Sequence, residues 1–196
     1  MRESCQAKDD HPPAGRMNPL ISKLQGGDLR SIGRANEVVA EVLKSPALLD
    51  QLFEGLFVDD LRVRARSADA LEKVSAKRPE WLHPYRGRLI GKVANIEQKE
   101  VRWHLAQIIG RLKWTARQRT MAVTLLRTYL KESDSEIVKV SALQALADLA
   151  VADSKLKASV SQLICESLEG GSPSLRARAR KLAGHQLRAQ RRGSSQ

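Results

Sequence analysis

Hydrophobic residues recur along this chain with the spacing of one α-helical face, and one twelve-residue pattern of them occurs five times. The copies occupy residues 31–42, 63–74, 101–112, 138–149 and 175–186, with 32, 38, 37 and 37 residues between successive starts. In the fourth copy the apolar positions i, i+4, i+7, i+8 and i+11 are Val138, Ala142, Ala145, Leu146 and Leu149. A period of this length is typical of stacked units that bury their apolar faces against one another.

A second, more strongly apolar helical stripe precedes each copy, at residues 20–24, 48–57, 89–93, 125–130 and 156–168. The pattern therefore predicts an all-α protein of about ten helices in five antiparallel pairs, with small stripe residues allowing close helix contacts. Asn18, Ser45 and Ser172 each precede a proline, which is typical of a helix N-terminus. The glycine pairs at 26–27 and 170–171 are expected just past helix ends, in left-handed backbone.

The pattern also predicts the domain organisation. We expect a disordered N-terminal extension at residues 1–16, a single helical-repeat domain at 17–190, and a flexible tail at 191–196. The first residues have no apolar segment of the kind found in secretory signals, and no apolar run is long enough to span a membrane. Cys5 and Cys165 do not form a disulfide framework, so we expect a cytoplasmic monomer.

The net charge of +12 is unevenly distributed along the chain. Residues 78–131 hold twelve basic and three acidic side chains, and residues 172–196 hold seven basic and none acidic. All three tryptophans and both tyrosines fall within the first of these segments. A basic central region with interleaved aromatic residues suits acidic protein segments or nucleic acid.

The third copy carries the clearest family resemblance. Its motif, Val101-Arg-x-x-Leu-Ala-x-x-Ile-Gly-x-Leu112, resembles the second helix of a HEAT repeat, as do the acidic residues that precede the copies. The resemblance covers about residues 17–190 and implies a right-handed α-α superhelix whose second helices line the concave face. It also implies that the basic residue at position two pairs with an acidic group of an adjacent repeat; these residues are Arg64, Arg102, Lys139 and Arg176.

Helical geometry then predicts which side chains a partner would meet. Positions three, seven, ten and fourteen point away from the apolar stripe, and in the third copy they are Trp103, Gln107, Gly110 and Trp114. Position four borders this lane with Arg34, Arg66, His104 and Arg178, and Arg111 lies beside it. Gln144 occupies position seven of the fourth copy. Trp114 has a second interpretation, packing beneath the following helix, and Trp81 and Tyr85 are expected to lie in the core or to wedge between helices.

These features favour a non-enzymatic scaffold that binds an acidic protein segment on a basic, Trp-containing concave surface. The alternative is nucleic-acid binding, as in the HEAT-like alkylpurine DNA glycosylases, which the chain resembles in placing Trp in a basic groove. Those enzymes need a carboxylate one turn from that Trp, and Gln107 stands there instead, so glycosylase activity is not expected. The four histidines and two cysteines lack metal-ligand spacing, and we expect no metal or cofactor.

Overall fold

Helices form all the regular secondary structure in the part of the chain described by the computed structural model, residues 18–28 and 31–193. They confirm the predicted all-α fold. The α-helices are α1 (Pro19–Ser22), α2 (Ala35–Lys44), α3 (Leu49–Glu54), α4 (Leu61–Lys77), α5 (Arg86–Ile90), α6 (Lys99–Arg111), α7 (Ala116–Glu132), α8 (Glu136–Ala152), α9 (Ser154–Gly170) and α10 (Pro173–Gly193). The expected extension, residues 1–16, lies outside the described residues.

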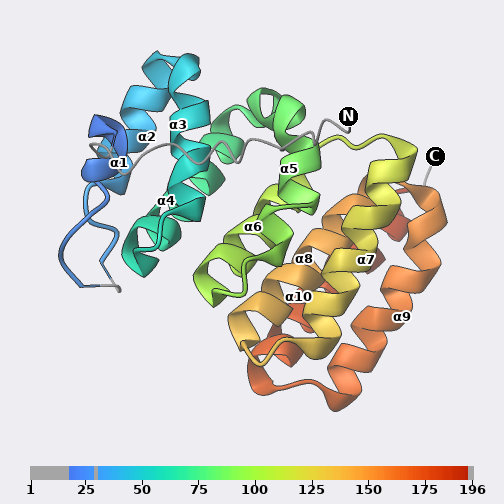
Figure 1. Ribbon diagram of the computed structural model, residues 1–196. Coiled ribbons are helices and arrows are strands. Elements are labelled where there is room, and N and C mark those ends of the chain that lie inside the picture. Colours follow the sequence, from blue (N-terminus) through green and yellow to red (C-terminus); the bar gives the residue numbers. More distant parts are fainter. Residues whose placement is uncertain (1–17, 29–30, 194–196) are drawn as a thin grey trace, which may run out of the picture.

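The α-helices pack as sequential pairs, as the repeat predicted (Figure 1). We call α1, α3, α5, α7 and α9 the first helices, and α2, α4, α6, α8 and α10 the second helices. Each second helix packs directly against the second helix of the next pair, from α2 through to α10. The second helices therefore form one continuous row. The expected site residues were predicted on these helices and would lie along this row.

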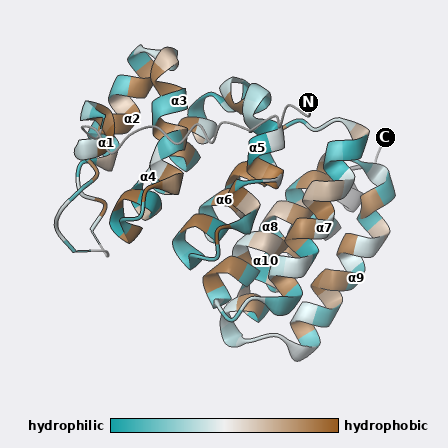
Figure 2. Ribbon diagram, viewed as in Figure 1, coloured by the Kyte–Doolittle hydropathy of each residue, from teal (hydrophilic) through white to brown (hydrophobic). Residues whose placement is uncertain are grey.

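The closest approach within this row is between α6 and α8. A Cβ atom added to Gly110 would lie 3.0 Å from the Cα atom of Ala145, so only glycine fits there without a shift. Helix α8 also contacts α7, α9 and α10, which explains why apolar residues occupy most of its circumference, apart from a few polar positions such as Gln144 and Asp148. Helix α9, by contrast, alternates between hydrophobic and hydrophilic positions in Figure 2, as expected for a helix with one side in solvent.

The first helix of the third pair is broken into three short elements. The 3₁₀ segment η3 (Pro79–Tyr85) contains Pro84 and leads into α5, and η4 (Val93–Asn95) follows. Pro84 lies just before α5, where a missing backbone donor is tolerated. Helix α5 is short because it ends at Ile90, before Gly91, whose φ of −109° and ψ of −94° are not helical. Tyr85 stacks on Phe53 of α3, with ring centroids 4.2 Å apart, and Trp81 packs against the core. Both aromatic residues wedge between helices as expected.

The turn before α2 differs from the expectation for the first copy. The copy begins at Ser31, but α2 begins at Ala35, and Gly33 adopts a φ of 51° before it. Gly26 and Gly27 have φ values of 72° and 70°, which confirms the left-handed backbone predicted there. The same prediction for the pair at 170–171 is wrong. Gly171 has a φ of −76°, and its lack of a Cβ instead avoids a clash with the Ser167 carbonyl.

The basic residues at position two do not pair with acidic groups of adjacent repeats, so this expectation is wrong. Arg64 donates to the Val58 carbonyl at 3.0 Å, Arg102 to the Ile96 carbonyl at 3.1 Å and Arg176 to the Gly171 carbonyl at 2.9 Å. Each arginine thus holds the turn that leads into its own helix. Lys139 lies 3.8 Å from Glu136 of the same helix. Two of these four also reach the next pair: Arg64 donates to the neutral amide of Gln98, and the Arg102 guanidinium lies 5.5 Å from the centre of the Tyr129 ring of α7.

Candidate interaction surface on the second helices

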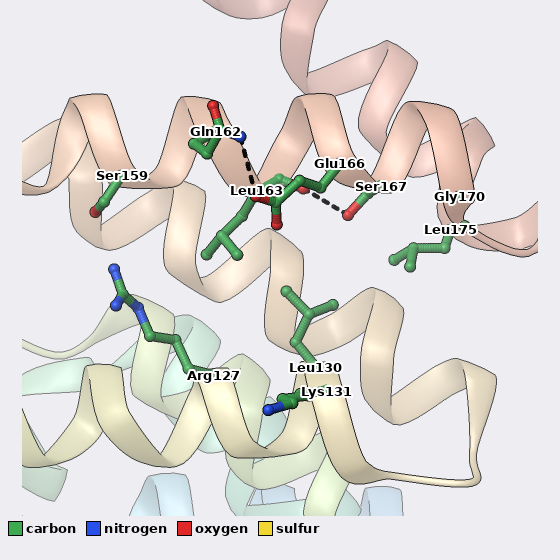
Figure 3. A pocket seen from close by; sticks show the side chains of 11 residues that line it. Arg127, Leu130, Lys131, Ser159, Gln162, Leu163, Glu166, Ser167, Gly170 and Leu175 are labelled. Atoms are coloured by element: carbon green, nitrogen blue, oxygen red, sulfur yellow. Dashed lines mark hydrogen bonds between the residues drawn. The ribbon is translucent and has the colours of Figure 1, made fainter.

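The second helices form the tighter row of the solenoid. The first helices α7 and α9 are separated by a hollow of about 690 Å³, shown in Figure 3. Leu130 and Leu163 point into this hollow, with Arg127 of α7 and Glu166 of α9 at its edges. Successive second helices pack directly against one another along the whole row, whereas α3 and α5, and α7 and α9, make few direct contacts, so we infer that the second helices lie on the inner side of the curve. We call their solvent-facing side the inner face.

The centre of the inner face is the cluster of Trp103, His104 and Gln107 on α6. Trp103 is half-buried and packs against the core, and its ring centroid lies 5.0 Å from that of His104. The Gln107 side chain interacts with His104, while the His104 Nδ1 atom is buried without a hydrogen-bond partner. A half-buried tryptophan ring beside the Gln107 amide is a surface to which a partner could add contacts, whereas the buried Nδ1 atom of His104 lies out of a partner's reach.

Burial lowers the pKa of His104, because the protonated ring loses its hydration inside the protein. Asp69 and Glu72 of α4 act in the opposite direction, and so does the interaction with Gln107. Lys73 lies 2.7 Å from Asp69 and donates to Asn36 of α2 at 2.8 Å. Polar contacts thus tie α2 and α4 together across the inner face, and His104 of α6 lies within the electrostatic influence of the α4 carboxylates.

Trp114 is not part of this surface, and the expected exposed lane from Trp103 to Trp114 is wrong. Helix α6 ends at Arg111, so the helical spacing does not extend to residue 114. The Trp114 side chain is 6% exposed, and its indole Nε1 donates to the Ile109 carbonyl at 3.0 Å. The alternative interpretation holds, since this tryptophan packs in the core below the turn between α6 and α7.

Arg66 is not part of the candidate surface either. It is 3% exposed and donates hydrogen bonds to the backbone carbonyls of the loop before α2. The acceptors are Leu24, Gln25, Gly26, Asp28 and Ser31. Because a partner cannot reach a guanidinium enclosed in this way, Arg66 is a clamp for the loop and the border of cations predicted at position four is interrupted.

Three other expected arginines do reach the inner face, but each is already engaged. Arg34 lies 2.7 Å from Glu37, and Arg111 lies 2.5 Å from Glu72 of the neighbouring second helix. Arg178 of α10 donates to the Gln144 Oε1 atom at 2.8 Å. Arginines that satisfy intramolecular acceptors contribute less to binding than free ones, because the existing contacts must first be given up.

Only part of the central basic segment lies on the second helices, so the expected basic inner face stays a prediction. Lys113 lies in the turn after α6, and α7 carries the exposed Arg117, Arg127 and Lys131. Helix α7 is a first helix, so these cations face away from the inner face. On the described second helices, α2, α4 and α6 each carry one exposed cation without an ion pair, whereas α10 carries three, at Arg180, Lys181 and Arg188; the other three are Lys44, Lys77 and Lys99.

Two polar residues that the sequence did not single out as site residues complete the inner face. The Gln144 Nε2 atom donates to the Asp148 Oδ1 atom at 2.8 Å, and both lie on α8 between Arg111 and Arg178. Partial burial raises the pKa of the Asp148 carboxyl, which the Gln144 hydrogen bond and the two arginines oppose. Gln144 matches Gln107 in the repeat, so its position was visible in the sequence; Asp148 gave no comparable signal.

Within the described ranges, no group of three or more His, Cys, Asp or Glu residues is placed to hold a metal ion. No helix of residues 18–28 and 31–193 is long and apolar enough to cross a membrane. A family model described as a HEAT repeat domain matches residues 27–164, from the loop held by Arg66 to the middle of α9. No curated protein matches the chain.

Proposed function

Since the chain belongs to the HEAT-repeat family, whose domains generally act as protein-interaction scaffolds, we propose that it binds an acidic segment of a partner protein. The segment lies along the inner face, from Trp103 on α6 across α8 to α10. Members of this family are typically non-catalytic, and the proposed role is binding without chemistry.

The observation that carries this proposal is the half-buried Trp103 beside His104 and Gln107, at the middle of the inner face. Tryptophan is enriched at the centres of protein interfaces because it contributes a large contact area with little loss of side-chain freedom. Gln107 adds amide donor and acceptor groups suited to a peptide backbone. The acidic character of the segment follows from the exposed cations on α10, which attract a negative chain toward that end.

Nucleic-acid binding is the second candidate, favoured by the net charge of +12 and by the exposed cations of α7 and α10. These two groups lie on different rows of helices, whereas a phosphate backbone needs a continuous track of cations. With Trp114 buried, Trp103 is the one tryptophan of α6 and its following turn that is open to a base. Protein binding therefore fits the geometry better.

Site-specific photo-crosslinking tests the proposal. A photoreactive amino acid placed at position 107 faces the inner face, and the same amino acid at position 124, an exposed site on α7, serves as the control. We expect position 107 to capture discrete protein segments rich in Asp and Glu, identified by mass spectrometry, and position 124 to capture none of them. Replacing Trp103 with alanine should reduce that capture at least about five-fold, since hot-spot aromatic residues contribute 2 kcal/mol or more.

Two results would overturn the proposal. Equal capture from positions 107 and 124 would show that the inner face has no special role. Capture from position 107 that disappears after nuclease treatment would replace a protein partner with nucleic acid.

A further inference from the structure

A second hollow of the molecule, with a volume of about 640 Å³, lies between α8, α9 and α10. The C-terminal half of α8, the first two turns of α9 and the middle of α10 line it. It meets the inner face at Gln144, Asp148 and Arg178. A volume of this size is sufficient for one or two amino-acid side chains of a bound peptide.

The floor of this pocket is apolar. Ala150 and Leu182 are buried, at 4% and 7% exposed, and Ala147 is half-buried between them and the inner face. Val151, at the end of α8, is 83% exposed and lies at the rim. An aliphatic side chain entering the pocket would cover this floor and gain the free energy of removing its own surface from water.

The walls carry more positive than negative charge. Lys157 of α9 and Lys181 of α10 are exposed and have no ion pair within the described residues, and His185 lies on the same wall as Lys181. Arg178 is held by Gln144, which in turn donates to Asp148, the one carboxylate of the pocket wall. The positive charge of Arg178 and the negative charge of Asp148 thus lie close together, joined through Gln144, and the charges of Lys157 and Lys181 have no acidic partner among the described residues.

We propose that this pocket is the anchoring subsite for the bound segment, and that it takes an aliphatic side chain flanked by carboxylates. The aliphatic group lies on Ala147, Ala150 and Leu182, and the flanking carboxylates lie against Lys157 and Lys181. This inference rests on the proposed function and extends it, because it defines a sequence preference and an end point for the segment on the inner face.

The shape and composition of the pocket favour a peptide over nucleic acid. Among the described residues that line it, there is no Trp, Tyr or Phe on which a base could stack. Its two free lysines lie on different helices, on either side of an apolar floor. That arrangement fits carboxylates on both sides of one apolar residue better than evenly spaced phosphates.

The ligand preference can be tested with purified protein and short fluorescein-labelled peptides by fluorescence anisotropy. The first probe consists of glutamates around a central leucine, the second has serine in place of the leucine, and the third has glutamines in place of the glutamates. We expect the first probe to bind about ten-fold more tightly than the second, since an aliphatic group in an apolar pocket contributes this much. The third should bind more weakly still, since it lacks all the carboxylates.

Charge reversals with matched controls locate the binding. Lys181→Glu should weaken the leucine probe about ten-fold, whereas Arg180→Glu changes the net charge equally outside the pocket and should weaken it less than about three-fold. Val151→Asp and Ala152→Asp form a second pair of adjacent exposed positions, of which only the first lines the pocket. Both pairs alter exposed side chains, so folding is not at risk, and circular dichroism can verify this.

The possible outcomes separate the two proposals. If the leucine probe binds but Lys181→Glu and Arg180→Glu weaken it equally, the pocket is not the anchor, although the scaffold still binds acidic segments. If neither the leucine nor the serine probe binds while single-stranded DNA does, both the anchor and the acidic protein partner are wrong. Equal binding of the leucine and serine probes would remove the apolar component of the anchor.

Discussion

Replacing Arg66 with alanine is expected to lower the free energy of unfolding by about 3–4 kcal/mol. The guanidinium is buried and makes its shortest hydrogen bonds, at 2.6, 2.6, 2.8 and 3.0 Å, with the carbonyls of Leu24, Gly26, Asp28 and Ser31. A hydrogen bond to a charged group contributes about 1.5–3 kcal/mol. The four do not add, because the freed carbonyls of a surface loop can turn toward water.

Urea unfolding followed by far-UV circular dichroism measures this loss. Arg66→Lys should lose about half as much, since one ammonium group cannot reach acceptors spread around a planar guanidinium. Arg62→Ala on the same helix is the matched control; its partly exposed pair with Asp60 should contribute less than about 1 kcal/mol. An Arg66→Ala protein within about 1 kcal/mol of wild type would refute the clamp and return Arg66 to the candidate binding residues.

Two further predictions concern Trp114 and His104. Trp114→Phe should cost about 1–3 kcal/mol in urea unfolding because it leaves the buried Ile109 carbonyl without its donor, while Trp103→Phe should cost less than about 1 kcal/mol. For His104, the folded-state pKa is below that of the unfolded chain, so its neutral form stabilises the protein above the unfolded value of about 6.5. That contribution is lost as pH falls below this value. Thermal melts from pH 8 to pH 5 should therefore show a flatter pH dependence for His104→Gln than for wild type; equal slopes for the two proteins would contradict the assignment.

The repeat in the sequence predicted the helix pairs because its apolar positions are the ones that neighbouring helices bury. In α4, α6 and α8, the apolar stripe coincides with the buried residues; examples are Val101, Leu105 and Ile109 of α6, each at most 1% exposed. The prediction for the first copy was wrong at its start, because residues 31–34 match part of the pattern but precede α2, which begins at Ala35. Arg66 of the next pair holds that turn by donating to the Ser31 carbonyl. A contact between residues 35 positions apart does not alter the hydrophobic periodicity, so the sequence pattern could not predict it.

Helical spacing also predicted the direction of side chains better than it predicted their surroundings. Trp103 and Trp114 share a direction only if the helix continues, and α6 ends between them at Arg111. Arg66 and His104 share position four, yet the first lies under a loop and the second beside Gln107. The residues that surround a side chain come from the neighbouring pair of helices, and the sequence of a single copy does not specify them.

The charge of the inner face illustrates the same limit and bears on function. Residues 78–131 are strongly basic as a segment, but their exposed cations are divided between α7, the connecting turns and α6, which carries only Lys99 and Arg111. The segment from residue 172 onward is instead dominated by a single second helix, α10, so its cations do contribute to the inner face. Among the described second helices, α10 therefore carries the most exposed cations without an ion pair. An acidic segment held at Trp103 would be attracted toward the pocket of Lys157 and Lys181, which favours its extension from α6 toward α10 over its extension toward α2.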